Sequence, residues 1–252
     1  MTPPHELVLA RPRDLSSLVG DALRVLLRHF GTFLALSAVV VLPVHLIVSG
    51  LGLEQLTAAY DSSPSVAETV IPTAVSFLVV APLINAICIY ALHSVAEGGR
   101  PRAGQSIVEG FEAFTPIFLA VVLAAVGIAA GLLLLIVPGI YVFVRWYFVP
   151  QAVVIQDARG PSALRRSWDL TAGFWWRTFG ILVVGNLVAL LPALVLSAPL
   201  AAVAESTDRA LWSLIGTMAT EMLTAPFLAL LSTLLYYDLR ARRREAALPP
   251  GG

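Results

Sequence analysis

Long apolar segments alternate with short polar segments along nearly the whole chain. Six apolar segments have the length and composition to cross a hydrocarbon core of about 30 Å, which takes roughly 20 helical residues. The expected spans cover residues 30–53, 66–93, 115–137, 139–156, 174–203 and 211–237. The pattern therefore predicts an all-α integral membrane protein with six transmembrane helices.

Three segments with helical rather than continuous apolar spacing, residues 14–30, 103–114 and 160–172, each precede a pair of spans. In the first, Asp14 is the expected N-cap, and Asp21 lies off the apolar stripe. Helices of this kind joined to a span are typical of the membrane interface. We expect three hairpins, each preceded by a cytoplasmic-side amphipathic helix, and the similar segments suggest three parallel repeat-like units, 14–93, 103–156 and 161–238.

The arginines predict the orientation of these spans. Fourteen of the sixteen basic residues lie in the N-terminal segment, the loops at 94–114 and 156–177, and the C-terminal tail. By the positive-inside bias, both termini should be cytoplasmic. We expect a tail over residues 1–13, one membrane domain over 14–238 and an Arg-rich tail over 239–252. The first dozen residues are too polar for a signal-peptide core, so the first span should act as an uncleaved insertion signal.

Composition agrees with a membrane protein and excludes several other classes. The chain is 58% hydrophobic and 13% charged, with a mean hydropathy of +0.85, well outside ordinary soluble composition. A net charge of zero, with the basic residues in short loops, argues against nucleic-acid binding. The single cysteine, Cys88, lies in an apolar run, which excludes an intrachain disulfide and favours a small buried hydrophobe.

Prolines and glycines should shape the spans. Pro72 and Pro82 interrupt the second span, and Pro192 and Pro199 the fifth, so we expect local kinks there. Pro138-Gly139 predicts a tight break between the third and fourth spans.

Small residues in the third span follow a four-residue spacing, with Gly127 and Gly131 as its glycines. Such a spacing permits close helix approach. We interpret this spacing as a site of helix packing inside the molecule, in preference to a dimerisation surface.

Five polar side chains inside the expected spans are candidate site residues: Arg145, Glu221, Asn85, Asn186 and His45. Arg145 and Glu221 lie at similar depths, so they could pair, either to fix the register of two helices or to form a functional polar site; a third alternative is that they do not meet. The two asparagines are expected to bond neighbouring helices, and His45 to bond a carbonyl freed by Pro43.

A second group of candidates lies on the cytoplasmic side. Basic residues packed into short amphipathic segments attract anionic headgroups. The alternative is that these residues only set the topology. The headgroup-binding candidates are Arg159, Arg165, Arg166, Trp168 and Arg177.

The sequence offers no catalytic, metal or cofactor motif. The four histidines are scattered without metal-ligand spacing, and there is no phosphate-binding loop, dinucleotide fingerprint or nucleophile elbow. We therefore expect no enzyme activity, no cofactor and no catalytic or metal-binding residues.

Several motifs together resemble a known family. The run from Pro138 to Trp146, the Gly160-Pro161 segment ending at Ser167-Trp168, and the ending Leu235-Tyr-Tyr-Asp-Leu-Arg240 resemble the membrane domain attached to some bacterial glycerophosphoryl diester phosphodiesterases and its stand-alone relatives. The resemblance implies a six-helix domain in a bacterial cytoplasmic membrane. In the fused enzymes the chemistry belongs to a separate soluble barrel, which this chain has no room for, so phosphodiesterase activity does not transfer.

The sequence therefore predicts a non-enzymatic polytopic membrane protein that interacts with lipids or organises the membrane. The expected partners are membrane lipids with anionic headgroups and a separate protein for which the chain is an anchor. The alternative is a small transporter or channel with a polar site around Arg145 and Glu221. The sequence leaves the oligomeric state open.

Overall fold

The computed structural model describes residues 9, 11–48, 59–60, 65–97 and 99–247, and this part of the chain is all-helical, with no strand. The elements are α1 (Leu15–Arg28), α2 (Phe30–Val48), α3 (Val66–Val75), η1 (Ser76–Val80), α4 (Ala81–Ala96), α5 (Ala103–Glu112), α6 (Phe114–Leu134), α7 (Ile136–Trp146), α8 (Val149–Gln156), α9 (Pro161–Thr171), α10 (Trp175–Pro192), η2 (Ala193–Ser197), α11 (Ala198–Thr207) and α12 (Ala210–Ala247).

Within the described ranges, six helical segments are long and apolar enough to cross a membrane, which confirms the predicted number of segments with this property. They are Phe30–Val48, Thr69–Ala96, Phe114–Leu134, Ile136–Gln156, Trp175–Thr207 and Ala210–Ala246. The predicted end of the first span, residues 49–53, lies outside the described residues, as does the predicted tail up to residue 8. Within the predicted C-terminal tail, α12 continues as a helix through Ala247.

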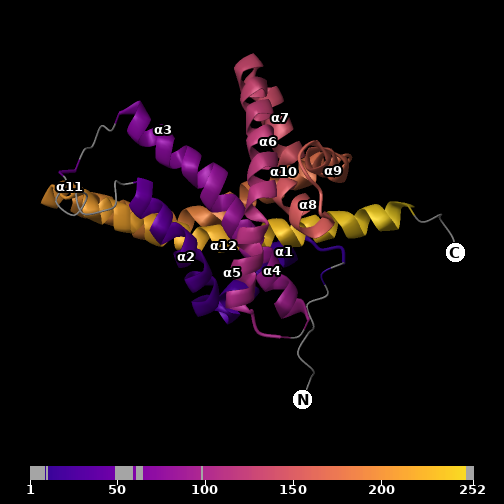
Figure 1. Cartoon of the computed structure of the whole chain (residues 1–252), viewed down its shortest axis with the longest axis horizontal. Coiled ribbons are helices and arrows are strands. Elements are labelled where there is room, and N and C mark those ends of the chain that lie inside the picture. Colours follow the sequence, from indigo (N-terminus) through magenta and orange to yellow (C-terminus); the bar gives the residue numbers. More distant parts are fainter. Residues whose placement is uncertain (1–8, 10, 49–58, 61–64, 98, 248–252) are drawn as a thin grey trace.

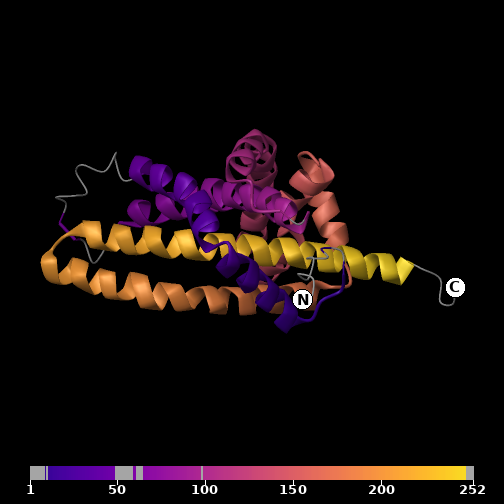
Figure 2. The same ribbon diagram turned by 90° about the horizontal axis from the view of Figure 1, so that it is seen from below.

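Helix α12 forms the axis of the molecule. It packs against α1, α2, α4, α10, η2 and α11, and in Figure 2 the α10–η2–α11 segment runs alongside it. The α6–α7 pair and the α2 and α3 helices point away from α12 in different directions (Figure 1). The helices therefore spread apart from a shared centre instead of forming one parallel bundle.

The buried core lies where the helices converge. Its main cluster joins Leu18 of α1, Phe33 of α2, Ile87 of α4 and Leu234 of α12, which are fully buried. A second cluster joins α6, α8 and α9. The far ends of α6 and α7 are different, because Leu133 is 89% exposed and Val137 76% exposed. Apolar surface of this kind suits a lipid environment and not water.

The second and fifth spans remain helical at their prolines. The π-helical turn η1 lies between Pro72 and Pro82, and η2 lies between Pro192 and Pro199. A π turn accommodates the missing backbone N–H by changing the hydrogen-bond spacing locally. The expected kinks are thus local changes of helical pitch.

The break between the third and fourth spans is at Leu135 and not at Pro138-Gly139. Leu135 is extended, with φ −164° and ψ 148°, and α7 begins at Ile136. Pro138 lies in the first turn of α7, where a missing N–H leaves no helical bond unmade. Gly139 is instead a contact point, since its backbone lies against Gly131 of α6.

Gly127 and Gly131 both pack inside the molecule. A Cβ at Gly127 would lie 2.3 Å from the Trp146 ring, and a Cβ at Gly131 would lie 3.1 Å from the Gly139 Cα. The four-residue spacing therefore lets α6 approach α7, in agreement with the preferred interpretation of this pattern.

A network of buried charges joins the two ends of the described chain. Asp238 is fully buried and accepts bonds from the Arg13 backbone N–H (2.6 Å), Arg177 Nε (3.1 Å) and Arg242 Nε (3.0 Å). Arg13 also donates to Asp21 (3.3 Å), which is only 4% exposed. Asp21 therefore belongs to the core, although its position off the apolar stripe predicted a surface residue.

Burial lowers the pKa of Arg13, and the hydrogen bond to Asp21 opposes that shift. The N-terminal segment before α1 is thus held by α12 and is not a free tail at Arg13. Removal of one partner from such a network leaves another charge buried without compensation.

Candidate intramembrane binding site

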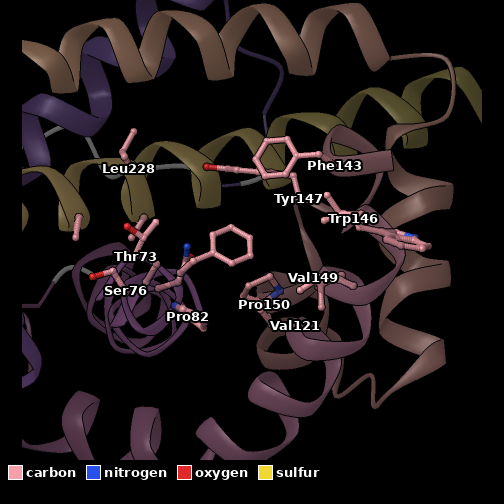
Figure 3. Close-up of a pocket in the computed structure, with 18 of the residues that line it drawn as sticks. Thr73, Ser76, Pro82, Val121, Phe143, Trp146, Tyr147, Val149, Pro150 and Leu228 are labelled. Atoms are coloured by element: carbon pink, nitrogen blue, oxygen red, sulfur yellow. The ribbon is translucent and has the colours of Figure 1, made fainter. Parts of the chain in front are cut away.

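A cavity of about 420 Å³ lies between the second, third, fourth and sixth spans. Its walls come from α3, η1, α4, α6, α7, α8 and α12, and they are mainly apolar. Figure 3 shows Phe143 and Tyr147 on one side, and Thr73, Ser76 and Pro82 on another. Pockets of this volume, apolar with a few polar groups, are typical of small-molecule sites.

Local structure explains why these side chains converge. The π turn η1 places Ser76 and Phe77 on the cavity. The α7 helix ends at Trp146 and α8 begins at Val149, so the chain bends beside the cavity, and Tyr147 lies at that bend. Both features interrupt regular α-helix at the site, a recurring property of functional positions in helices.

Asn85 is one polar group of the cavity wall. Its Oδ1 accepts a hydrogen bond of 2.9 Å from Gln151 Nε2, which also donates to Ser232 Oγ at 2.9 Å. Gln151 is fully buried, and its Oε1 has no hydrogen-bond partner in the described part of the chain. This amide chain links α4, α8 and α12 directly behind the cavity.

Glu221 is the carboxylic acid of the cavity wall. Its Oε2 lies 2.5 Å from His45 Nε2, so the carboxylate of α12 pairs with the imidazole of α2. The two side chains are 19% and 10% exposed, respectively. The expectation that His45 bonds a carbonyl freed by Pro43 is therefore wrong, because its Nε2 contacts a carboxylate on another helix.

Arg145 and Glu221 do not pair in the structure. Arg145 Nη2 donates to Tyr141 Oη (2.6 Å), its Nη1 donates to the Trp168 carbonyl (3.2 Å), and its guanidinium lies 4.8 Å from the centre of the Trp168 ring. Ser167 Oγ in turn donates to the Arg145 carbonyl. Arg145 thus attaches α9 to α7, and the third alternative holds for the predicted pair.

Arg145→Ala should lower the free energy of unfolding by about 2 kcal/mol, because hydrogen bonds from a charged donor and a cation–π contact are lost together. Arg145→Lys should recover only part of this, since an ammonium cannot reproduce the forked contacts. Unfolding by SDS titration in mixed micelles measures the effect. Arg165→Ala is the control, as Arg165 is 85% exposed on α9; equal effects at the two positions would contradict the docking role.

Asn186 is also separate from the cavity. Its Nδ2 donates to the Leu182 carbonyl of its own helix at 2.8 Å. It lines a different hollow of about 340 Å³ beside Phe143 and Leu187. The expectation that it bonds a neighbouring helix is therefore wrong, and only Asn85 and Glu221 of the five intramembrane candidates line the 420 Å³ cavity.

The candidates for headgroup binding divide into two groups. Arg159 and Arg165 are exposed, with weak contacts to Asp157 (3.5 Å) and Asp169 (3.9 Å). The others are held by the protein: Arg166 donates to the Gln156 carbonyl, Arg177 pairs with Asp238, and Trp168 covers Arg145.

Sequence reasoning missed Gln151 and Tyr147. Gln151 is a polar residue within the predicted fourth span, so the rule that selected Asn85 and Asn186 would have selected it too. No such signal exists for Tyr147, because an aromatic residue in a span is ordinarily part of the packing.

The comparisons with known proteins concern the second half of the molecule. Residues 102–239, which include α5 through most of α12, match the family described as a domain of unknown function, DUF7847. No curated protein and no solved structure matches the chain. Since the match covers more than half of the sequence, the chain belongs to the DUF7847 family.

Proposed function

We propose that this is a non-enzymatic multi-pass membrane protein that binds a lipid-like molecule in the 420 Å³ cavity. The single observation that carries the proposal is the cavity itself, formed by four spans, mainly apolar and furnished with few polar groups. Such a site offers an apolar molecule from the bilayer both burial and a fixed orientation.

The proposed topology has three hairpins, each preceded by an amphipathic helix: α1, α5 and α9. The proposed location is a bacterial cytoplasmic membrane with both termini in the cytoplasm. The distribution of arginines supports this orientation. Exposed Arg159 and Arg165 would then face anionic headgroups on the cytoplasmic side, where each basic residue contributes about 1 kcal/mol of attraction.

Two further roles were expected from the sequence, and the geometry supports them less. A transporter site needs Arg145, Glu221, Asn85 and Asn186 at one cavity, and only two of these line it. No surface in the described part of the chain specifically supports an anchor role. The proposed relation to the phosphodiesterase-linked membrane domains rests on sequence motifs and brings no activity to this chain.

Filling the cavity tests the proposal. Ala125→Phe places a ring in the cavity, whereas Ala130→Phe places the same ring on the exposed side of the same helix, α6. Native mass spectrometry of protein purified gently from its own membranes should show a bound lipid-like molecule in the wild type and in Ala130→Phe. The molecule should be absent from Ala125→Phe.

A lipid retained equally by both variants would place binding elsewhere on the surface and contradict the proposal. A thermal unfolding curve for each variant distinguishes a blocked cavity from a misfolded protein. Tm should differ little between the two variants, because neither substitution removes a buried charge or hydrogen bond.

A further inference from the structure

The cavity has an unequal charge distribution. Glu221 is the one ionisable acid among its lining residues, and no lining residue is basic. Its partner His45, in α2, is not among the lining residues. The Arg145 guanidinium, on the neighbouring α7, is directed to Tyr141 and Trp168 instead. The lining of the cavity therefore holds one carboxylic acid, which contacts His45, and no basic side chain.

The His45 contact uses only one of the two carboxylate oxygens of Glu221. His45 Nε2 lies 2.5 Å from that oxygen, Oε2. Glu221 Oε1 has no hydrogen-bond donor in the described part of the chain. A charge in such surroundings is costly unless a counter-charge or further donors reach it.

Aromatic rings line the same cavity. Phe77, Phe143, Trp146 and Tyr147 contribute to its wall from η1, α7 and the bend before α8. Ring faces attract cations, and this attraction grows where water is excluded. A carboxylate together with several rings is the chemistry that recognises an ammonium or phosphonium ion with apolar substituents.

The position of Glu221 within α12 favours a cation with apolar substituents. Glu221 lies eleven residues after Ala210, the first residue of α12. At 1.5 Å per residue this is roughly 17 Å along the helix from its first residue, within an apolar stretch of α12. A cation that reaches Glu221 along the apolar wall of the cavity would itself carry apolar substituents.

We infer that the cavity binds a lipophilic cation, with Glu221 as its counter-ion and the aromatic wall as its second contact. The inference rests on the proposed function and deepens it, since it names the charge of the molecule that the cavity holds. Asn85 supplies a neighbouring polar group, which would orient a ligand that also carries a hydrogen-bond acceptor.

Tetraphenylphosphonium and tetraphenylborate test this directly, because they have the same shape and opposite charges; triphenylmethane is the neutral probe. Saturable binding is measured by equilibrium dialysis against nanodiscs of zwitterionic lipid that hold the protein, and partition into empty nanodiscs is subtracted. The phosphonium should bind wild-type protein at least tenfold more tightly than triphenylmethane. The borate should show no saturable binding.

Glu221→Gln removes the charge and keeps an oxygen that accepts from His45. It should weaken phosphonium binding at least tenfold and leave triphenylmethane binding unchanged. Glu205→Gln, at an exposed position of α11, is the matched control and should change neither. The comparison of three probes on wild-type protein stands even where Glu221→Gln does not fold.

Two kinds of result would overturn the inference, and a third would overturn the proposed function. Equal affinities for the three probes, or an unchanged phosphonium affinity in Glu221→Gln, would overturn the inferred charge preference and leave a neutral-ligand cavity in place. Saturable binding of none of the probes to wild-type protein would overturn the inference, and an empty cavity in native mass spectrometry would separately overturn the proposed function.

Discussion

Asp238→Ala should lower the free energy of unfolding by about 3–5 kcal/mol, the largest effect of any single substitution considered for this protein. Asp238 is fully buried and receives bonds from Arg13, Arg177 and Arg242. Arg13 is itself 3% exposed. Without the carboxylate, these groups remain in an apolar environment with part of their charge uncompensated, because Asp21 is the other acid in the network.

SDS titration monitored by circular dichroism in mixed micelles measures this loss. Asp169→Ala is the matched control, since Asp169 is 66% exposed and lies 3.9 Å from Arg165. An exposed pair of this kind contributes at most about 1 kcal/mol. A wild-type unfolding curve for Asp238→Ala would show that the network does not hold the N-terminal segment to α12 and α10.

Gly139→Ala should destabilise the protein by about 1–3 kcal/mol, although alanine is the better helix former. The added Cβ would lie 2.3 Å from Leu132 Cδ2 and 2.8 Å from the Leu132 backbone nitrogen. A side chain can rotate away, but the backbone nitrogen can move only if α6 and α7 separate. The cost therefore comes from the close approach of the two helices.

Gly180→Ala in α10 is the control for this prediction, because a Cβ there meets no atom within 4 Å. It should raise stability by roughly 0.5–1 kcal/mol, the ordinary gain of alanine over glycine in a helix. The same unfolding assay reports both variants. Stabilisation by Gly139→Ala as well would mean that α6 and α7 do not pack as described.

The number and positions of the spans could be predicted from the sequence because they depend on local quantities. A run of about 20 apolar residues needs a helix and a membrane whatever its neighbours are. The predicted and observed segments therefore agree in place, and they differ mainly at their ends. The Pro138-Gly139 break was misplaced by a few residues because proline is tolerated in the first turn of a helix.

The partners of the intramembrane polar groups could not be predicted in the same way. Arg145 and Glu221 were matched by depth, which assumes parallel neighbouring helices. The α6–α7 pair instead points away from α12 (Figure 1), so Arg145 meets Trp168 of α9 and Glu221 meets His45 of α2. Depth is a property of one helix, whereas pairing depends on how helices cross.

The buried charged network around Asp238 could not be predicted, for a related reason. Asp21 looks like a surface residue on its own helix, and Arg13 looks like part of a polar tail. Their burial depends on Asp238, which is 225 positions from Arg13 in sequence. Helical periodicity carries no information about a contact at that separation, and only the assembled fold brings the groups together.

Photo-crosslinking tests the proposed occupancy of the cavity most directly. A lysophosphatidylcholine with a diazirine at the end of its acyl chain is photolysed with the protein in nanodiscs, and adducts are mapped by mass spectrometry. The proposal predicts adducts on Phe77, Phe143 and Tyr147 that disappear as unlabelled lipid is added. Adducts confined to outward apolar residues such as Leu133 and Val195, with no saturation, would contradict it.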